Sequence, residues 1–211
     1  MEVMSDPTTA GLRQHGKQAM RLALVGIARD LLNTEGLGRL STRRIAQQAG
    51  TSTTAIYSLF GGKDGLMEAL YLDGFDRLEA ALRAVPTGGT DPPLQRIVAL
   101  NRQYRAFALQ HPQDYAVMFE RGIPGFQPTA AAQLRAWQSL QPLIQRIREA
   151  QASGALLHHP CEDLAMKLWV ATHGVVSLEL AGYFPERLEA QAMHDRLIQE
   201  LLGPEAADTG R

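Results

Sequence analysis

Residues 41–70 read STRRIAQQAGTSTTAIYSLFGGKDGLMEAL, which combines two short helical patterns with a tight turn between them. Ser41 is a favourable N-cap for the first helix, and Gly50 supplies the left-handed residue that ends it. Ser52 is a favourable N-cap for the second helix, which two consecutive glycines then stop. The two predicted helices cover 42–48 and 53–59. Two short helices joined by such a turn predict a helix-turn-helix.

The apolar positions of the two short helices face each other. The predicted contact joins Ile45, Ala46 and Ala49 to Ile56 and Phe60. The side chains left exposed on the second helix are hydrogen-bonding groups without negative charge, namely Thr53, Thr54, Tyr57 and Ser58. Such a surface approaches phosphates and base edges without repulsion, so the sequence predicts double-stranded DNA as a partner.

The charge of the chain is unevenly divided. Residues 11–65 carry eight basic against three acidic side chains, a difference of +5, whereas the formal net charge of the whole chain is −1. This division indicates that the first quarter of the chain faces a polyanion. Arg43 and Arg44 lie on the first short helix, which crosses the DNA backbone in a helix-turn-helix, so either side chain is a candidate to neutralise a phosphate.

The same region resembles the tetracycline-repressor-like (TetR) family of regulators over roughly residues 20–70. The matching features, in the order and spacing of the family, are Ile45–Ala46, Ala49–Gly50, Ser52, Ile56–Tyr57, Phe60, Lys63 and Leu66. The resemblance implies that Tyr57 and Lys63 clamp phosphates and that Thr53 and Thr54 reach bases. Lys63, with the amides at the start of its helix, would also form an anion site.

Two positions depart from the family pattern. The family often has a basic residue where Thr53 stands and an aromatic residue where Leu59 stands. The resemblance therefore implies no base preference. The predicted DNA-contacting set is Ser41, Thr42, Arg43, Arg44, Ser52, Thr53, Thr54, Tyr57, Ser58 and Lys63.

Almost every other segment has the apolar periodicity of a helix, and none alternates as a strand does. The sequence predicts an all-α fold, with an N-terminal three-helix DNA-binding domain and a C-terminal helical domain for ligand binding and dimerisation. The expected ranges are 15–62 for the first domain, 63–85 for a connecting helix and 86–203 for the second domain. Pro142 predicts a kink or a break in a long helix over 129–153.

The second domain carries bulky side chains that are candidates to line a cavity between helices, where bundles place ligand sites. They are Tyr104, Phe107, Met118, Phe119, Trp137, Trp169 and His173. These residues predict an apolar or aromatic small-molecule effector, although the pattern of each residue taken alone favours ordinary core. The resulting hypothesis is a repressor that such an effector releases from a palindromic operator.

A homodimer is expected because one short recognition helix makes few base contacts, and two half-sites about 34–36 Å apart are the usual solution. Two final helices, over 162–182 and 185–202, are the predicted seam. The predicted interface residues are Leu164, Leu168, Ala171, Val175, Leu178, Leu197 and Leu201. Two such helices from each chain would pack as a four-helix bundle.

Composition narrows the remaining function classes. Hydrophobic content of 45% and charged content of 20% are ordinary for a globular protein, and no apolar run reaches the roughly 18 residues of a membrane span. With no signal peptide evident, a cytoplasmic location is expected. No cofactor or metal is predicted, because His158, His159 and Cys161 lack a turn that would bring them to one ion.

Two alternatives to a ligand-responsive regulator stay open. The first is a constitutive or architectural DNA binder whose C-terminal domain only dimerises, which predicts a closed core. The second is a small helical enzyme, which needs paired carboxylates, a nucleophile with its base, or a phosphate loop. The sequence places none of these sets convincingly, so an enzyme is not expected.

Overall fold

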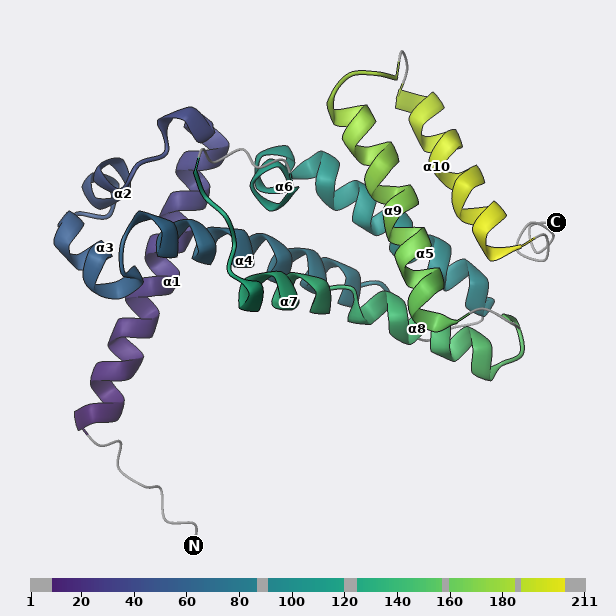
Figure 1. Cartoon of the computed structure of the whole chain (residues 1–211), viewed down its shortest axis with the longest axis horizontal. Helices are drawn as coiled ribbons and strands as arrows, with labels where there is room; N and C mark the ends of the chain where they lie inside the picture. Colours follow the sequence, from purple (N-terminus) through teal and green to yellow (C-terminus); the bar gives the residue numbers. More distant parts are fainter. Residues whose placement is uncertain (1–8, 87–90, 120–124, 157–159, 185–186, 204–211) are drawn as a thin grey trace, which may run out of the picture. The chain divides into compact units, whose positions relative to one another are not determined.

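A computed structural model describes residues 9–86, 91–119, 125–156, 160–184 and 187–203 (Figure 1). Every regular element in these ranges is helical, which confirms the all-α prediction. The elements are α1 (Thr9–Glu35), the short 3₁₀ turn η1 (Leu37–Arg39), α2 (Thr42–Gln48), α3 (Thr53–Phe60), α4 (Lys63–Arg83), α5 (Pro93–Gln110), α6 (Pro112–Phe119), α7 (Ala130–Gln138), α8 (Gln141–Ala152), α9 (Cys161–Leu180) and α10 (Arg187–Leu202). No helix within the described ranges is long and apolar enough to cross a bilayer.

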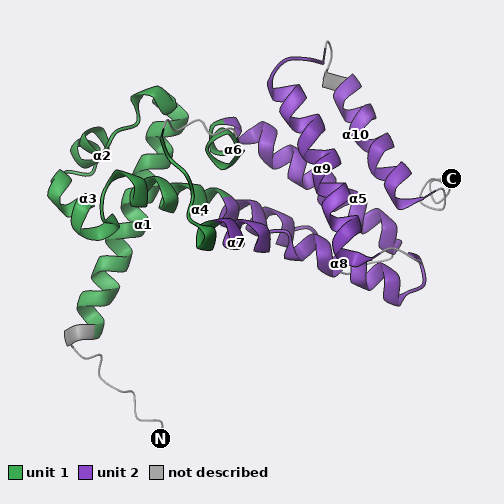
Figure 2. Ribbon diagram, in the orientation of Figure 1, with its two compact units in different colours: residues 1–74, 113–132 green, residues 75–112, 133–211 purple. Residues whose placement is uncertain are grey.

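The chain divides into two compact units (Figure 2). Unit 1 consists of residues 1–74 and 113–132, and unit 2 consists of residues 75–112 and 133–211. Helix α4 contributes to both units, because the division falls between Gly74 and Phe75. The domain ranges expected from sequence, 15–62, 63–85 and 86–203, are instead consecutive along the chain. That division stays a prediction.

The core of unit 1 joins α1, α2 and α3, which pack on one another. Its buried apolar side chains include Leu24, Ala28, Leu31, Leu32, Ile45, Ala46, Ile56 and Phe60. Both predicted N-caps are present: the Ser41 hydroxyl accepts a hydrogen bond from the Arg44 amide, and the Ser52 hydroxyl accepts one from the Ala55 amide, each at 3.2 Å. Each cap satisfies one of the amides that a helix start leaves without an intrahelical partner.

Glycine is required just after α2 and just after α3. Gly50 and Gly61 have φ angles of 61° and 75°, a region that residues with a side chain rarely adopt. Gly65 stands where an added Cβ would overlap the carbonyl oxygen of Phe60. The turn from α3 into α4 is therefore closed by a backbone contact that only glycine permits.

In unit 2, helix α9 packs against α5, α8 and α10. The core between these helices consists of Leu94, Ile97, Val98, Leu143, Ile144, Ile147, Ala150, Leu156, Leu164, Ala165, Leu168, Ile198 and Leu202. The predicted break at Pro142 is confirmed, because α7 ends at Gln138 and α8 begins at Gln141. Pro142 lies in the first turn of α8, where a missing N–H costs no helical hydrogen bond.

Candidate functional site

Helix α3 presents the uncharged polar surface that the sequence predicts. Thr53, Thr54, Tyr57 and Ser58 are all exposed, and Tyr57 keeps 54% of its surface accessible. The opposite face of α3 is anchored by Ile56, which is fully buried. These four side chains are thus available to a partner, and the DNA contact itself stays a prediction.

Arg21 supports the C-terminal end of α3 from α1, a role that sequence reasoning missed. Its guanidinium donates a hydrogen bond to the carbonyl oxygen of Leu59. The same guanidinium carbon lies 4.4 Å from the centroid of the Phe60 ring, within the range of a cation–π interaction. A cation at the C-terminus of a helix also favours the helix dipole. The end of α3 is therefore held by charge as well as by apolar packing.

The two neighbouring arginines of α2 differ in their surroundings. Arg44 donates to Glu35 through Nη2, at 2.5 Å, and through Nε, at 3.3 Å. That hydrogen bond holds the pKa of Glu35 below its usual value. Arg43 is exposed to solvent, as is Lys63 at the first position of α4. Arg43 and Lys63 are consequently the better candidates for phosphate contact, whereas Arg44 already has a carboxylate partner.

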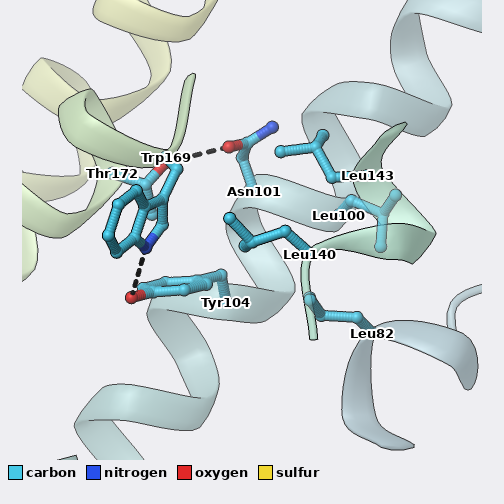
Figure 3. Close-up of a pocket in the computed structure, with 8 residues that line it drawn as sticks. All are labelled: Leu82, Leu100, Asn101, Tyr104, Leu140, Leu143, Trp169 and Thr172. Carbon is cyan, nitrogen blue, oxygen red and sulfur yellow. Dashed lines mark hydrogen bonds between the residues drawn. The ribbon is translucent and has the colours of Figure 1, made fainter. Parts of the chain in front are cut away.

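A narrow pocket in unit 2 brings together two of the predicted ligand residues (Figure 3). Tyr104 and Trp169 line it, and the Trp169 ring nitrogen donates to the Tyr104 hydroxyl at 3.2 Å. The other lining residues are Leu82, Leu100, Asn101, Leu140, Leu143 and Thr172. The Thr172 hydroxyl donates to the Asn101 side-chain oxygen at 2.9 Å, which creates one polar corner among apolar walls. The pocket has room for about one water molecule.

Two further predicted ligand residues stand next to the pocket. Trp137 meets Trp169 edge to face, with ring centroids 6.1 Å apart. His173 lies one turn after Trp169 in α9, with ring centroids 5.9 Å apart. Neither Trp137 nor His173 lines the pocket, so both support the position of the Trp169 ring instead.

The three remaining predicted ligand residues do not line this pocket, and their contact with a ligand stays a prediction. Phe107 is buried and packs on the ring of His111, with centroids 5.0 Å apart. Met118 belongs to unit 1, where it packs against the backbone of Gly74. Phe119 also belongs to unit 1 and contacts an aromatic ring of its own helix. An apolar aromatic side chain has the same sequence signature in a core as in a pocket.

Beside the pocket, α5, α9 and α10 share a buried ion pair that the sequence did not reveal. Arg105 of α5 donates to Glu179 of α9 through Nε, at 2.8 Å, and through Nη2, at 2.6 Å. Both side chains are 8% exposed. Arg105 also donates to Gln191 of α10. An isolated buried charge is costly, and this bidentate pair with a third partner is the arrangement that offsets the cost.

His194 of α10 is fully buried. Together with Asn101, Thr172 and the Arg105–Glu179 pair it forms the buried polar layer of unit 2. The Thr172 hydroxyl donates its hydrogen to Asn101 and lies within hydrogen-bond distance of His194 Nε2, at 3.2 Å. Burial lowers the pKa of His194, and this effect outweighs the carboxylate of Asp195, which lies 3.4 Å from Nδ1. The neutral imidazole is therefore the folded form of this residue.

Stability is expected to decrease as the pH falls from 7 toward 5. The folded-state pKa of His194 lies below its unfolded value, so the unfolded chain takes up a proton first as the pH falls below about 6.5. His194 contributes at most about 1.4 kcal/mol per pH unit to this slope. His194→Gln, which keeps a donor for Thr172, should flatten the slope in urea unfolding measured at several pH values.

His173 serves as the comparison in that experiment. Burial lowers its pKa as well, so it contributes to the slope in the same direction. His173→Gln should therefore remove a second part of the pH dependence. Identical slopes for the unsubstituted chain and for His194→Gln would contradict the assignment of a neutral, buried His194.

The structure corrects part of the predicted dimer seam. Leu164, Leu168 and Val175 are buried within the chain's own core, so they present no surface to a second copy. Ala171, Leu197 and Leu201 are half-buried, whereas Leu178 is 48% exposed. The most apolar stripe of α9 faces inward, and the exposed stripe of α9 consists of Met166, Val170 and Leu178, with the half-buried Gly174 between the last two.

Metal binding finds no support among the described residues. No group of three or more His, Cys, Asp or Glu side chains in those ranges could hold an ion. His158 and His159 lie outside the described residues. Burial raises the pKa of the Cys161 thiol, which makes it a poorer metal ligand and nucleophile at neutral pH.

Comparison with known proteins gives matches to both parts of the chain. A family model described as bacterial regulatory proteins of the tetR family matches residues 24–70. A second model, described as the tetracyclin repressor-like C-terminal domain, matches residues 97–201. An HTH-type transcriptional regulator of Mycobacterium tuberculosis (strain H37Rv) is 25% identical over 124 residues, which cover 58% of this chain and 53% of that protein. The match thus spans about half the length of that curated relative.

Solved structures extend the likeness over most of the chain. A protein of unknown function from Rhodococcus sp. RHA1 is 28% identical, with a TM-score of 0.71 over 87% of this chain and 95% of that one. RolR in complex with resorcinol is 16% identical, with a TM-score of 0.68 over 92% of this chain and 96% of that one. The second likeness shows the fold alone.

Proposed function

The chain belongs to the tetracycline-repressor (TetR) family of bacterial regulatory proteins, and from this premise we propose that it is a transcriptional regulator that binds duplex DNA through α2 and α3. A family of regulators agrees with the expectation that the chain is not an enzyme. The observation that carries the proposal is the surface of α3, whose exposed side chains are uncharged and polar around Tyr57. The negatively charged backbone of duplex DNA meets no electrostatic repulsion at this surface.

In this proposal α3 enters the major groove and its flanks contact phosphates. Thr53 and Thr54, in the first turn of α3, are the candidates for base contact, and their short side chains require a close approach. Tyr57, Arg43 and Lys63 are exposed around them and are the candidates for phosphate contact. The hydroxyls of Ser41 and Ser52 serve as N-caps, so they position the helices rather than the DNA.

Selection of bound duplexes from a random pool tests this function. The full chain should enrich a pair of related half-sites in inverted orientation, with centres about one helical turn or a multiple of it apart. Enriched sequences without any symmetry would overturn the palindromic operator. The absence of any enrichment above the starting pool would overturn sequence-specific binding.

We further propose that the chain acts as a homodimer through the exposed stripe of α9 together with α10. Val170 is 57% exposed and Leu178 is 48% exposed in the single chain, an unfavourable arrangement for large apolar groups on a helix surface. Met193 of α10 is exposed as well. Gly174 lies on the same stripe with no atom near its missing side chain, which leaves space for the close approach of a partner helix.

Val170→Glu is expected to dissociate the dimer at micromolar concentration. Burying an unpaired carboxylate twice in a symmetric interface costs several kcal/mol, so the dissociation constant should rise by about 100-fold or more. Light scattering at micromolar protein measures the mass. Leu134→Glu, at a position that is 60% exposed on α7, is the matched control and should leave the dimer intact. An unsubstituted chain that is monomeric would contradict the proposal.

The proposed effector is a small apolar or aromatic molecule that enters the pocket beside Trp169. Leucine walls favour apolar groups, and the Asn101–Thr172 corner and the Tyr104 hydroxyl favour one hydrogen-bonding substituent. Because the pocket has room for about one water molecule, binding must be accompanied by movement of lining side chains. Release from DNA then follows from a shift between DNA-competent and incompetent arrangements.

Tryptophan fluorescence gives a direct readout of such binding, because the chain has two tryptophans and both stand at or beside the pocket. A library of apolar and aromatic compounds should contain members that change this signal and weaken DNA binding. Thr172→Val should reduce affinity most for compounds with a hydroxyl group. A library without any such compound would overturn the effector proposal and leave DNA binding standing.

The narrowness of the pocket favours one alternative, a constitutive DNA binder whose unit 2 only dimerises. In that case operator affinity is independent of added compounds, and pocket-filling substitutions leave binding unchanged. The compound library above separates the two functions, because only a ligand-responsive regulator loses operator affinity with a saturable dependence on the compound.

A further inference from the structure

Helix α1 is longer than the domain core requires. It begins at Thr9, whereas its first fully buried side chain is Leu24. The intervening turns carry Arg13 and Lys17, which are exposed, and Arg21, which is half-buried. No acidic residue occurs between residues 9 and 29.

The basic residues of these turns share one face of the helix. Arg13, Lys17 and Arg21 follow one another at four-residue spacing, and Leu24 and Ala28 continue the series at three and four residues. At 3.6 residues per turn all five positions fall within about 80° of arc. The face that is buried in the domain core therefore becomes basic in the turns that precede the core.

The contacts of Arg21 show where this face points. Its guanidinium caps the C-terminal end of α3, through the Leu59 carbonyl and the Phe60 ring. Helix α1 passes beside α3 and continues beyond it toward the N-terminus (Figure 1). From Arg21 to Arg13 the helix rises about 12 Å, which is about a third of a helical turn of duplex. Arg13 and Lys17 thus extend from the end of α3 in one row.

The row is chemically suited to a polyanion. Neither Arg13 nor Lys17 forms an ion pair in the described part of the chain, so both charges are available. Two of the exposed apolar side chains of this segment, Leu12 and Leu22, lie on the opposite arc of the helix, whereas the third, Met20, lies at the edge of the row beside Arg13. A protein partner that binds through apolar contacts would use that other arc.

We propose that Arg13 and Lys17 form a second DNA-contacting surface, which binds phosphates of the duplex beyond the segment occupied by α3. The inference rests on the proposed DNA-binding function, because it places the row against the same duplex. Each protomer would then neutralise about two more phosphates than the helix-turn-helix alone.

The salt dependence of binding tests the inference. Arg13→Gln/Lys17→Gln removes both charges and keeps a good helix former at each position. In the full chain, with a duplex selected by the unsubstituted protein, the slope of log Kd against log salt should become shallower by about 2 for each protomer. At physiological salt the affinity should fall by about tenfold or more.

Arg83→Gln/Arg148→Gln is the matched control, since it removes two exposed positive charges from unit 2 at positions outside α9 and α10. Its slope should equal that of the unsubstituted chain. Shortening the duplex to the edges of the two half-sites should weaken binding of the unsubstituted chain and leave that of Arg13→Gln/Lys17→Gln unchanged. Equal slopes for this variant and the unsubstituted chain would overturn the second surface alone. Failure of the unsubstituted chain to bind any duplex would instead overturn the proposed function.

Discussion

Tyr57→Ala is expected to weaken specific DNA binding by about two orders of magnitude or more and to leave the fold unchanged. The phenol is 54% exposed at the centre of the α3 surface, so truncation removes contact area without opening the core. Loss of one good contact costs about 1–3 kcal/mol, and a symmetric dimer loses it twice. Fluorescence anisotropy with a selected duplex measures the change in Kd.

Tyr183→Ala provides the control for this substitution, because Tyr183 is 76% exposed and lies in unit 2. It removes the same side chain from a surface without a proposed DNA role, and its Kd should equal that of the unsubstituted chain. Thermal unfolding should be unaffected in both variants. Specific binding by Tyr57→Ala at the original affinity would show that α3 does not face the DNA.

The second large effect is expected on stability: Arg105→Met should lower the free energy of unfolding by about 3–5 kcal/mol. The substitution leaves the Glu179 carboxylate buried without its bidentate partner, and an unpaired buried charge is more costly than the lost attraction. Chemical denaturation followed by circular dichroism measures the difference. Arg105→Met/Glu179→Leu should recover most of the loss, because it removes both charges from the interior.

Arg102→Met separates burial from simple charge loss. Arg102 also pairs with a carboxylate, Asp195 at 3.0 Å, and stands one turn before Arg105 on α5, but its side chain is 51% exposed. An exposed pair contributes about 0–1 kcal/mol, so this variant should be nearly as stable as the unsubstituted chain. Equal destabilisation by Arg102→Met and Arg105→Met would contradict the account of the buried pair.

The helix-turn-helix could be predicted from sequence because its signals are local. Ser41 and Ser52 cap the helices that follow them, and Gly50 and Gly61 adopt the left-handed conformation expected of their positions. Each of these signals depends on residues within one or two turns of the chain. The exposed surface of α3 then follows from helical periodicity alone.

The buried polar layer of unit 2 could not be predicted in that way. Arg105 and Glu179 are 74 residues apart in sequence, and each reads as a solvated charge until α5 and α9 are packed together. Arg21 is a similar case, since the Leu59 carbonyl to which it donates lies 38 residues away at the end of α3. Long-range pairing of polar groups has no periodic signature.

Helix α9 illustrates a different limit. The sequence shows that α9 has apolar residues on more than one side, but periodicity does not say which side faces the chain's own core. Leu164 and Leu168 form the stronger stripe and are buried, whereas Val170 and Leu178 form the weaker stripe and are exposed. When a helix has apolar residues on more than one side, only the tertiary structure shows which side faces the core.

Binding of duplex DNA by the full chain at low salt tests the central claim most directly. A fluorescent duplex pool of mixed sequence, titrated with protein at about 50 mM salt, should give a saturable rise in anisotropy. Non-specific affinities of DNA-binding proteins are about 10⁻⁴–10⁻⁶ M at physiological salt, so half-saturation is expected at micromolar protein or below. An anisotropy that stays flat to high micromolar protein would contradict the assignment of α3 and its basic flanks as a DNA-binding surface.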